Sequence, residues 1–221
     1  DLVIEHDPSN RRVVVAPVDQ ASLSEGVAAL SEMDSTMAGL AERNGVPPLW
    51  PRDPGFPTMV RLILEQQVSL ASADAAFRNL EKAIGRVEPE GFLDLDDAEL
   101  RGIGFSRQKT GYVQAIAAGL LGGSIDLIAI GGLDDAAASD RLLGIRGIGP
   151  WTAACYLLFA LRRPDVWPPG DRALQVSMGR VFNLDAVPNV EESNVRAAAW
   201  RPLRSVAARM LWYDYLGGPG E

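Results

Sequence analysis

Residues 143–154 read Leu143-Gly144-Ile145-Arg146-Gly147-Ile148-Gly149-Pro150-Trp151-Thr152-Ala153-Ala154, a glycine-rich turn between two helix-like segments. Glycine adopts positive φ without strain and lets another backbone come close. Pro150 suits the first turn of a helix because its φ is already fixed near the helical value. The turn can therefore present backbone N–H groups to a phosphate oxygen at a helix N-terminus. A plain connection between two antiparallel helices explains the same residues, so this stretch alone leaves both interpretations open.

The rest of the chain carries mainly helical patterns. Apolar residues recur every three or four positions, and helices are expected over Ser22–Asn44 (one or two helices), 58–66, 69 or 72 to 84, 96–100, 107–121, 134–143, 151–161, 172–182 and 190–215. Gly45–Pro57 holds five prolines and is predicted as a loop, and Arg12–Val15 is predicted as a short strand. The predicted fold class is therefore all-α, with many short helices.

The composition excludes several classes of protein. Of the 221 residues 47% are hydrophobic and 23% are charged, which is too apolar for a disordered chain. A single Cys excludes an internal disulfide, an all-Cys zinc site and a four-Cys iron–sulfur cluster. Because His6 is the only histidine, a His-based metal site and a Ser-His-Asp triad are also disfavoured.

Charge and apolar runs bear on partners and location. The net charge is −8, with 8 Lys or Arg against 18 Asp or Glu in residues 1–100 and 13 against 11 in residues 101–221. Binding depends on the local field, so this acidic total permits a neutral or basic binding face. The longest apolar run, 153–161, is shorter than the roughly 20 residues that span a bilayer. With no signal-peptide pattern at the start, we expect no membrane partner and a cytoplasmic location, at the nucleoid in a bacterium.

Five motifs in a fixed order identify a family. Besides the turn, they are Ile63-Leu64-Glu65-Gln66-Gln67-Val68-Ser69, Ser106-Arg107-Gln108-Lys109 after a first Leu100-Arg101-Gly102-Ile103-Gly104-Phe105, Trp167-Pro168-Pro169-Gly170-Asp171, and Trp200-Arg201-Pro202-Leu203-Arg204-Ser205 with Trp212-Tyr213. From about Phe56 to Tyr215 the chain resembles the HhH-GPD DNA glycosylases, which carry a helix-hairpin-helix, and within them the DNA-3-methyladenine glycosylase II branch. The resemblance implies a monofunctional enzyme that excises alkylated bases such as 3-methyladenine from double-stranded DNA.

The resemblance also implies an arrangement of two helical lobes. Residues 58–168 are expected to form a helical bundle that carries the helix-hairpin-helix at about 142–161. Residues 1–57 and 169–221 are expected to form the other lobe, with Asp171 in the cleft between the two. A monomer is expected.

Asp171 matches the catalytic position of the family. Cleaving the bond between base and sugar leaves positive charge on the sugar, which a fixed carboxylate stabilises. The same carboxylate can orient or deprotonate the attacking water, and the sequence leaves both roles open. Asp171 also directly precedes a helical pattern, where Asp is a favoured N-cap. The two interpretations are compatible.

Trp151 indicates that the strand is not cut. Family members that also cleave the strand carry a lysine at this position, whose amine attacks the sugar, and the only lysines here are Lys82 and Lys109. The expected product is an intact abasic site. In the alkylation-repair branch a tryptophan here lines the base pocket, where its electron-rich face attracts a cationic alkylated base. Ordinary core packing is the alternative.

Three further residues are implied in the base pocket, Trp212, Cys155 and Tyr156. Phe159 is a weaker candidate. For Trp212, Tyr156 and Phe159 the alternative is ordinary core packing, and for Cys155 it is an inert buried thiol. Gln67, with Gln66 as the second choice, matches the side chain that fills the gap left by the flipped nucleotide, and the alternative is a buried turn between helices.

The resemblance places phosphate contacts at the hairpin amides around Gly147, Gly149, Trp151 and Thr152. Basic candidates are Arg107, Lys109, Arg146, Arg172 and Arg204, each of which could equally be a solvated surface charge. The family often binds a monovalent cation, Na⁺ or K⁺, at the hairpin carbonyls, here near Arg146 and Ile148. No other cofactor is required, and no iron–sulfur cluster is expected.

Two further interpretations stay open. A non-catalytic helix-hairpin-helix DNA-binding module would leave Asp171 as a cap and the tryptophans as core. A superfamily member acting on oxidised bases, or on adenine opposite 8-oxoguanine, is disfavoured by the missing lysine and the missing cysteines. A helical protein-interaction scaffold explains none of the motif order.

Overall fold

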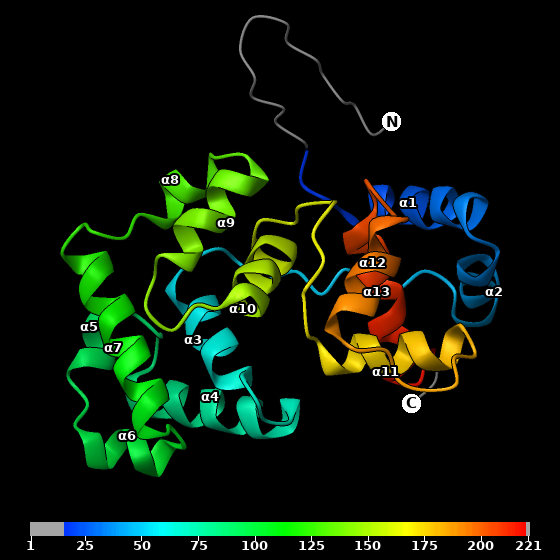
Figure 1. The fold of residues 1–221 in the computed structure, drawn as a ribbon. Coiled ribbons are helices and arrows are strands. Elements are labelled where there is room, and N and C mark those ends of the chain that lie inside the picture. Colours follow the sequence, from blue (N-terminus) through cyan, green and yellow to red (C-terminus); the bar gives the residue numbers. More distant parts are fainter. Residues whose placement is uncertain (1–15, 220–221) are drawn as a thin grey trace, which may run out of the picture. The chain divides into compact units, whose positions relative to one another are not determined.

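The computed structural model describes residues 16–219. Regular structure in this range consists of thirteen α-helices and one π-helical turn, without a strand (Figure 1). The all-α prediction is therefore confirmed for residues 16–219, while the predicted strand Arg12–Val15 lies outside the described residues. Across the same range, none of the helices combines the length and apolar character that a membrane span needs.

The chain divides into two compact units. One comprises Arg52–Tyr156, and the other combines the described residues 16–51 with 157–219. The sequence placed the divisions after residues 57 and 168, whereas the contacts place them after residues 51 and 156.

The unit 52–156 is built around α3 (Phe56–Glu65). This helix packs against α4 (Leu70–Ile84), α7 (Arg107–Leu121) and α10 (Pro150–Cys155) (Figure 1). The remaining helices of the unit are α5 (Pro89–Leu93), which packs on α7, α6 (Asp97–Ile103), α8 (Leu127–Gly131) and α9 (Asp135–Leu143). Seven of the ten residues of α3 are buried, which explains why it occupies the centre of the unit.

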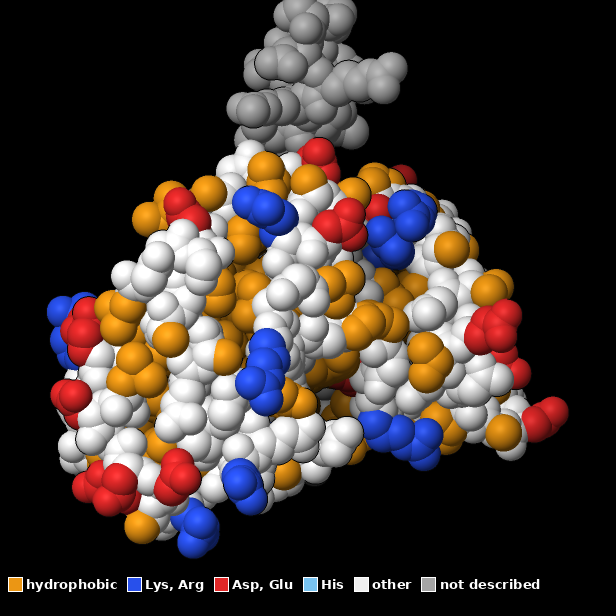
Figure 2. All heavy atoms as spheres, turned by 60° about the vertical axis from the view of Figure 1, so that its left-hand side comes forward, with side chains coloured by type: hydrophobic (Ala, Val, Ile, Leu, Met, Phe, Trp, Pro, Cys, Tyr) orange, Lys and Arg blue, Asp and Glu red, His pale blue; other side chains and the backbone are white. Residues whose placement is uncertain are grey.

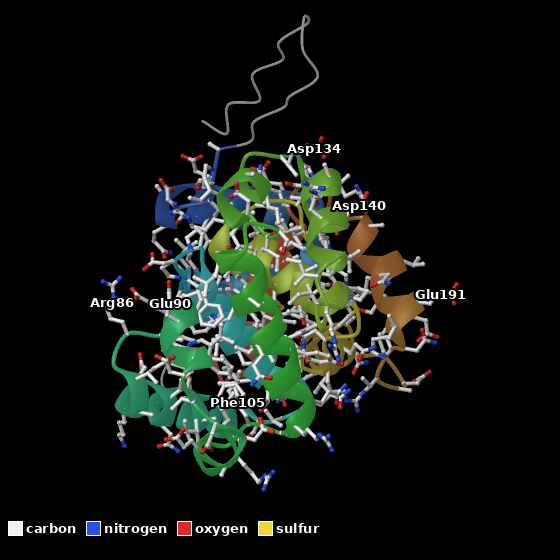
Figure 3. All side chains as sticks on the ribbon, turned by 90° about the vertical axis from the view of Figure 1, so that its left-hand side faces the viewer. Arg86, Glu90, Phe105, Asp134, Asp140 and Glu191 are labelled. Atoms are coloured by element: carbon white, nitrogen blue, oxygen red, sulfur yellow. The ribbon has the colours of Figure 1, made fainter. Side chains whose placement is uncertain are left out.

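Three phenylalanines join the core of this unit. Phe92 packs edge-to-face against Phe56 at 6.1 Å and against Phe105 at 5.3 Å between ring centroids, an arrangement that aromatic pairs prefer. Phe105 points inward beneath α7, whereas Arg86 and Glu90 point away from the helices (Figure 3). The rings therefore tie α3, α5 and the start of α7 together.

The other unit is built around α13 (Arg204–Tyr215). It packs against α1 (Gln20–Met33), α2 (Ser35–Asn44), α11 (Arg172–Val181) and α12 (Val190–Ala198). Small buried residues of α13, Ser205, Ala207 and Ala208, allow close packing. On the facing side, a Cβ on Gly26 of α1 would lie 2.8 Å from Cγ2 of Val206. A glycine here is what lets α1 and α13 approach so closely.

Helix caps account for many of the acidic residues. Nine α-helices of the described chain begin with an Asp, Ser or Asn whose side chain accepts a backbone N–H of the first turn: Asp19, Asp34, Ser69, Asp96, Ser106, Asp126, Asp134, Asp171 and Asn189. Carboxylates at these positions satisfy orphan donors and complement the positive end of the helix dipole. Six of the 29 acidic residues thus serve as helix N-caps.

Three helix predictions need correction, and two short helices were not predicted. The short helices α5 and α8 carry too few residues for a periodic pattern, and the sequence did not reveal them. The segment predicted as helix 151–161 becomes a π-helical turn, η1 (Tyr156–Ala160), after α10. The predicted helix 190–215 breaks between α12 and α13, where Pro202 lacks an N–H and disfavours helix at the residue before it. Finally, α3 begins at Phe56, inside the predicted loop.

Asp34 should be the most costly cap to remove. Its Oδ1 accepts the N–H groups of Thr36 and Met37, and its Oδ2 accepts Nε1–H of the buried Trp200 at 3.0 Å. Asp34→Ala should lower the free energy of unfolding by about 3 kcal/mol, since it removes a cap and leaves a buried indole donor without its acceptor. Urea unfolding measures this loss.

Asp134→Ala provides the control. The side chain of Asp134 caps α9 through the N–H of Ala137, so its loss should cost about 1 kcal/mol. Equal losses in the two variants would show that the bond from Trp200 to Asp34 contributes nothing.

Candidate functional site

The glycine-rich turn forms the predicted hairpin between α9 and α10. Gly147 has φ of +90°, and a Cβ there would lie 2.3 Å from the ring of Tyr112 on α7. Gly149 differs, since its φ is −94° and no atom lies within 4 Å of its Cβ position. As the N-cap of α10, Gly149 makes no side-chain cap bond. One glycine is therefore required by conformation and by contact, and the other leaves the start of α10 without a side-chain cap.

The first Gly-Ile-Gly has a different geometry. Gly102 and Ile103 belong to the last turn of α6, and Gly104 ends that helix with φ of +122°. A Cβ on Gly104 would lie 3.1 Å from Cβ of Ala76. The first Gly-Ile-Gly therefore forms the end of α6, and of its residues only Gly104 lies between α6 and α7, where it lets α4 approach.

The two glutamines after α3 point to different tasks. Nε2 of Gln66 donates to the carbonyl of Gly147 and to Oγ1 of Thr152, both at 3.0 Å. Gln67 is exposed and adopts φ of +57°, in the left-handed region. Gln66, predicted as a second choice for the plug, therefore ties the turn to the hairpin, while Gln67 is presented at the surface.

Lys109 has an intramolecular role. Its Nζ donates to the carbonyls of Leu64 at 2.7 Å and Gln66 at 2.9 Å, where the last carbonyls of α3 lack helical partners. Burial lowers the pKa of this ammonium below its ordinary value. The group that was predicted to contact a phosphate is thus held by backbone oxygens at the end of α3.

The other predicted phosphate contacts fall into two groups. Arg107, Arg146 and Arg172 are exposed. Arg204 lies in a bidentate ion pair with Asp165, with Nε to Oδ1 at 2.7 Å and Nη2 to Oδ2 at 3.0 Å, and also donates to the Asp165 carbonyl. Arg204 therefore braces the loop before Asp171.

Asp171 is both a cap and the acceptor of an indole bond. It is half-buried at the N-cap of α11, where its Oδ1 accepts the N–H of Leu174 at 2.9 Å. The same oxygen accepts Nε1–H of Trp212 on α13 at 3.1 Å. The structure thus brings together two of the predicted site residues and fixes the carboxylate by donors from two helices.

A stack of charged and aromatic groups lies behind this carboxylate. The rings of Trp212 and Phe159 are nearly parallel, with centroids 5.1 Å apart, and the Arg209 guanidinium lies 5.8 Å from the Phe159 centroid. Arg209 is fully buried and donates to the carbonyls of Leu49, Ser205 and Leu158. Burial lowers its pKa to about 10, so it stays protonated at neutral pH.

The sequence did not reveal Arg209, and it indicated Phe159 only as a weaker pocket candidate with core packing as the alternative. Phe159 belongs to η1, and a π-helical turn shifts side-chain directions away from the α-helical register. Arg209 has the helical spacing of a surface arginine, and nothing in its own segment indicates that it is buried.

The remaining predicted pocket residues belong to the unit 52–156. Trp151 is half-buried at the second position of α10. Cys155 and Tyr156 are fully buried, and the Tyr156 hydroxyl accepts the N–H of Gly55 at 3.0 Å. Burial raises the pKa of this hydroxyl. Trp151 alone of these three has surface to offer a ligand.

Among residues 16–219, no group of three or more His, Cys, Asp or Glu side chains is arranged to hold a metal ion. At the hairpin, the carbonyl of Gly147 lies between Arg146 and Ile148 and accepts the Gln66 amide.

The fold, the hairpin and the capped aspartate define a class of protein, and comparison with known families identifies it. The family of HhH-GPD superfamily base excision DNA repair proteins matches residues 60–204. This chain belongs to that superfamily.

Individual relatives extend the comparison. A putative DNA-3-methyladenine glycosylase of Bacillus subtilis is 31% identical over 162 residues, which cover 70% of this chain and 56% of that protein. The match therefore spans little more than half of that relative. The solved structure of Schizosaccharomyces pombe 3-methyladenine DNA glycosylase in complex with abasic DNA has a TM-score of 0.80 and 25% identity, over 86% of this chain and 95% of that one. A DNA-3-methyladenine glycosidase from Bacillus halodurans has a TM-score of 0.72 and 28% identity, over 86% and 88%.

Substitutions at the two hairpin glycines should differ in their effect on the free energy of unfolding. Gly147→Ala places a Cβ against Tyr112 and forces alanine into positive φ, so it should lower the free energy of unfolding by about 2–4 kcal/mol. Gly149→Ala meets open space at an ordinary φ and should change it by less than about 1 kcal/mol. Urea unfolding of both variants checks this, and similar losses would contradict the assigned geometry.

Proposed function

We propose that this chain is a monofunctional DNA glycosylase. It turns an alkylated base such as 3-methyladenine out of double-stranded DNA, hydrolyses the bond between base and sugar, and leaves an abasic site for base excision repair. The observation that carries the proposal is the half-buried carboxylate of Asp171, fixed by the Leu174 N–H and the Trp212 indole. The family and the names of its relatives support the same reading.

The chemistry asks for a carboxylate that does not move. As the bond to the base breaks, positive charge develops on the sugar, and a pre-positioned negative group stabilises it without reorganisation. Asp171 is held by a backbone donor of α11 and a side-chain donor of α13. The same carboxylate can also orient or deprotonate water for attack on the sugar, and both roles fit this geometry.

The aromatic residues provide the selectivity for alkylated bases. An alkylated purine carries positive charge and is attracted to an electron-rich indole face. Trp212 is stiffened by stacking on Phe159 and by its bond to Asp171. A base held beside this ring would therefore lie next to the carboxylate that completes the reaction, and Trp151 is the second candidate for stacking.

The two lysines do not support strand cleavage. Position 151 carries tryptophan, which cannot attack the sugar as an amine does. Lys109 is bonded to the carbonyls of Leu64 and Gln66, and Lys82 lies in the last turn of α4. The product is therefore an abasic site in an uncut strand.

The surface charge favours weak, salt-sensitive binding to undamaged DNA. Figure 2 shows Lys and Arg side chains in separate groups on the face that it displays, with acidic, neutral and apolar surface between them. Few phosphate contacts together with a net charge of −8 make affinity depend on the lesion and fall as salt rises. The protein would work where the chromosome lies, which in a bacterium is the nucleoid in the cytoplasm.

Asp171→Asn is the principal test. Asparagine is also a good N-cap and can still accept from Leu174 and Trp212, so folding should persist while the charge is lost. Single-turnover release of 3-methyladenine from duplex DNA should fall roughly 100-fold or more. Asp134→Asn, the same change at the cap of α9, should leave the rate unchanged.

The outcomes of this test separate the candidate functions. Base release that collapses in Asp171→Asn, with the strand uncut until alkali is added, supports the proposal. Strand scission without alkali contradicts the monofunctional assignment. DNA binding without release of any alkylated base identifies a binding module or a glycosylase for another damaged base.

Trp212→Phe tests the indole bond. Phenylalanine can keep the stacking on Phe159 but removes the donor to Asp171, so base release should slow about tenfold, the worth of one charge-assisted hydrogen bond. The affinity for undamaged DNA should not change. Trp200→Phe removes an equivalent indole bond, to Asp34, away from Asp171, and equal slowing in both variants would show that only packing is involved.

A further inference from the structure

We propose that Lys109 and Gln66 are positioning residues that hold the turn after α3, so that Gln67 is ready to enter the duplex. The proposal rests on the proposed function, because it concerns how a glycosylase fills the gap left by the flipped nucleotide. It assigns Lys109 a role through the backbone in place of a direct phosphate contact.

The conformation of Gln67 is the first observation. Its φ of +57° is uncommon for a residue with a side chain, and such strain persists only where neighbouring contacts fix the backbone. Gln67 is exposed, and the side chains on its C-terminal side include the exposed apolar residues Val68 and Leu70. The turn thus exposes the polar side chain of Gln67 followed by two apolar side chains, and this combination suits insertion between stacked base pairs.

The anchors are the second observation. Immediately before Gln67, the ammonium of Lys109 binds the carbonyls of Leu64 and Gln66 at 2.7 and 2.9 Å. The Gln66 amide crosses to the hairpin and donates to the Gly147 carbonyl and to Thr152. Lys109 reaches the turn from α7, and Gln66 reaches from the turn to the hairpin, so the turn is tied to both.

The location of the anchors predicts that phosphate binding at the hairpin and filling of the gap by Gln67 are coupled. The hairpin is the part of the unit 52–156 that is expected to bind a phosphate, and the side chain of Gln66, the residue before Gln67, bonds directly to it. Lys109 is partly buried, which lowers its pKa, and its ammonium is satisfied by the two carbonyls at the end of α3. The hairpin that is expected to bind a DNA phosphate and the residue that is expected to fill the gap are therefore tied together within this unit.

Binding to two duplexes tests the assignment. One duplex is undamaged and the other contains a tetrahydrofuran abasic analogue, and the dissociation constant of each is measured over a range of salt concentrations. Lys109→Met should reduce the preference for the abasic duplex about tenfold, as loss of a charge-assisted bond predicts. Its affinity for the undamaged duplex and the slope of that affinity against salt should equal those of the wild type.

Four variants calibrate the measurement. Arg107→Met, two residues away and exposed, should reduce the salt slope on both duplexes by about one and keep the preference. Lys82→Met, the other lysine, should change neither quantity. Gln67→Ala should lose the preference, and Lys109→Met combined with Gln67→Ala should lose no more than Gln67→Ala alone, because the two act on one event.

Amide hydrogen exchange over residues 64–70 keeps the test independent of catalysis. Faster exchange there in Lys109→Met, with the rest of the chain unchanged, supports the anchor, and Gln66→Leu provides the same reading if Lys109→Met does not fold. A salt slope reduced by about one in Lys109→Met, an unchanged preference, or additive losses would overturn the proposal. If the wild type shows no preference for the abasic duplex, the proposed function fails, and unchanged exchange would then overturn the anchor as well.

Discussion

One carboxylate oxygen joins the parts of the unit formed by residues 16–51 and 157–219. Oδ1 of Asp171 accepts the first-turn N–H of α11 and the indole N–H of Trp212 on α13. The indole stacks on Phe159, and behind that ring lies a buried guanidinium that satisfies three carbonyls. A buried charge is tolerated only when its hydrogen-bonding groups are satisfied, so the position of each member depends on the next. The group that starts α11 is thus also the group to which we assign the reaction in the proposed function.

The helix caps and the proposed catalytic group are the same residue type in this chain. Asp occupies the N-cap of six helices in the described part of the chain, and at five of them its known work is structural. Asp171 and Asp34 each accept an indole N–H from a tryptophan that packs on other rings, but Trp200 at Asp34 is fully buried whereas Trp212 at Asp171 is half-buried. The distinction lies in the surroundings of the carboxylate, since the local sequence is that of a cap in each case.

Local patterns made much of the fold predictable. The hairpin, the caps and most helix positions follow from spacing and from residues whose preference depends on their own segment, such as Pro150 and Gly147. The family's motif order placed Asp171 and Trp212 at one site, and the structure brings those two together. The sequence could not reveal the contacts that a side chain makes with residues far away in the chain. Lys109 looks like any cation at a helix start until Leu64 and Gln66 are placed opposite it, and Arg204 looks like a phosphate contact until Asp165 is found beside it.

The π-helical turn at Tyr156–Ala160 fixes the number of residues that this segment must contain. A π-helical turn is in effect an α-helix with one residue inserted. Removing a single residue there would restore the α-helical register and rotate everything beyond it by about 100° about the axis, carrying Phe159 away from the Trp212 ring. Evolution can therefore exchange side chains in this segment more readily than it can alter their number. Among homologues, gaps should be rarer across these five positions than the variety of their residues would suggest.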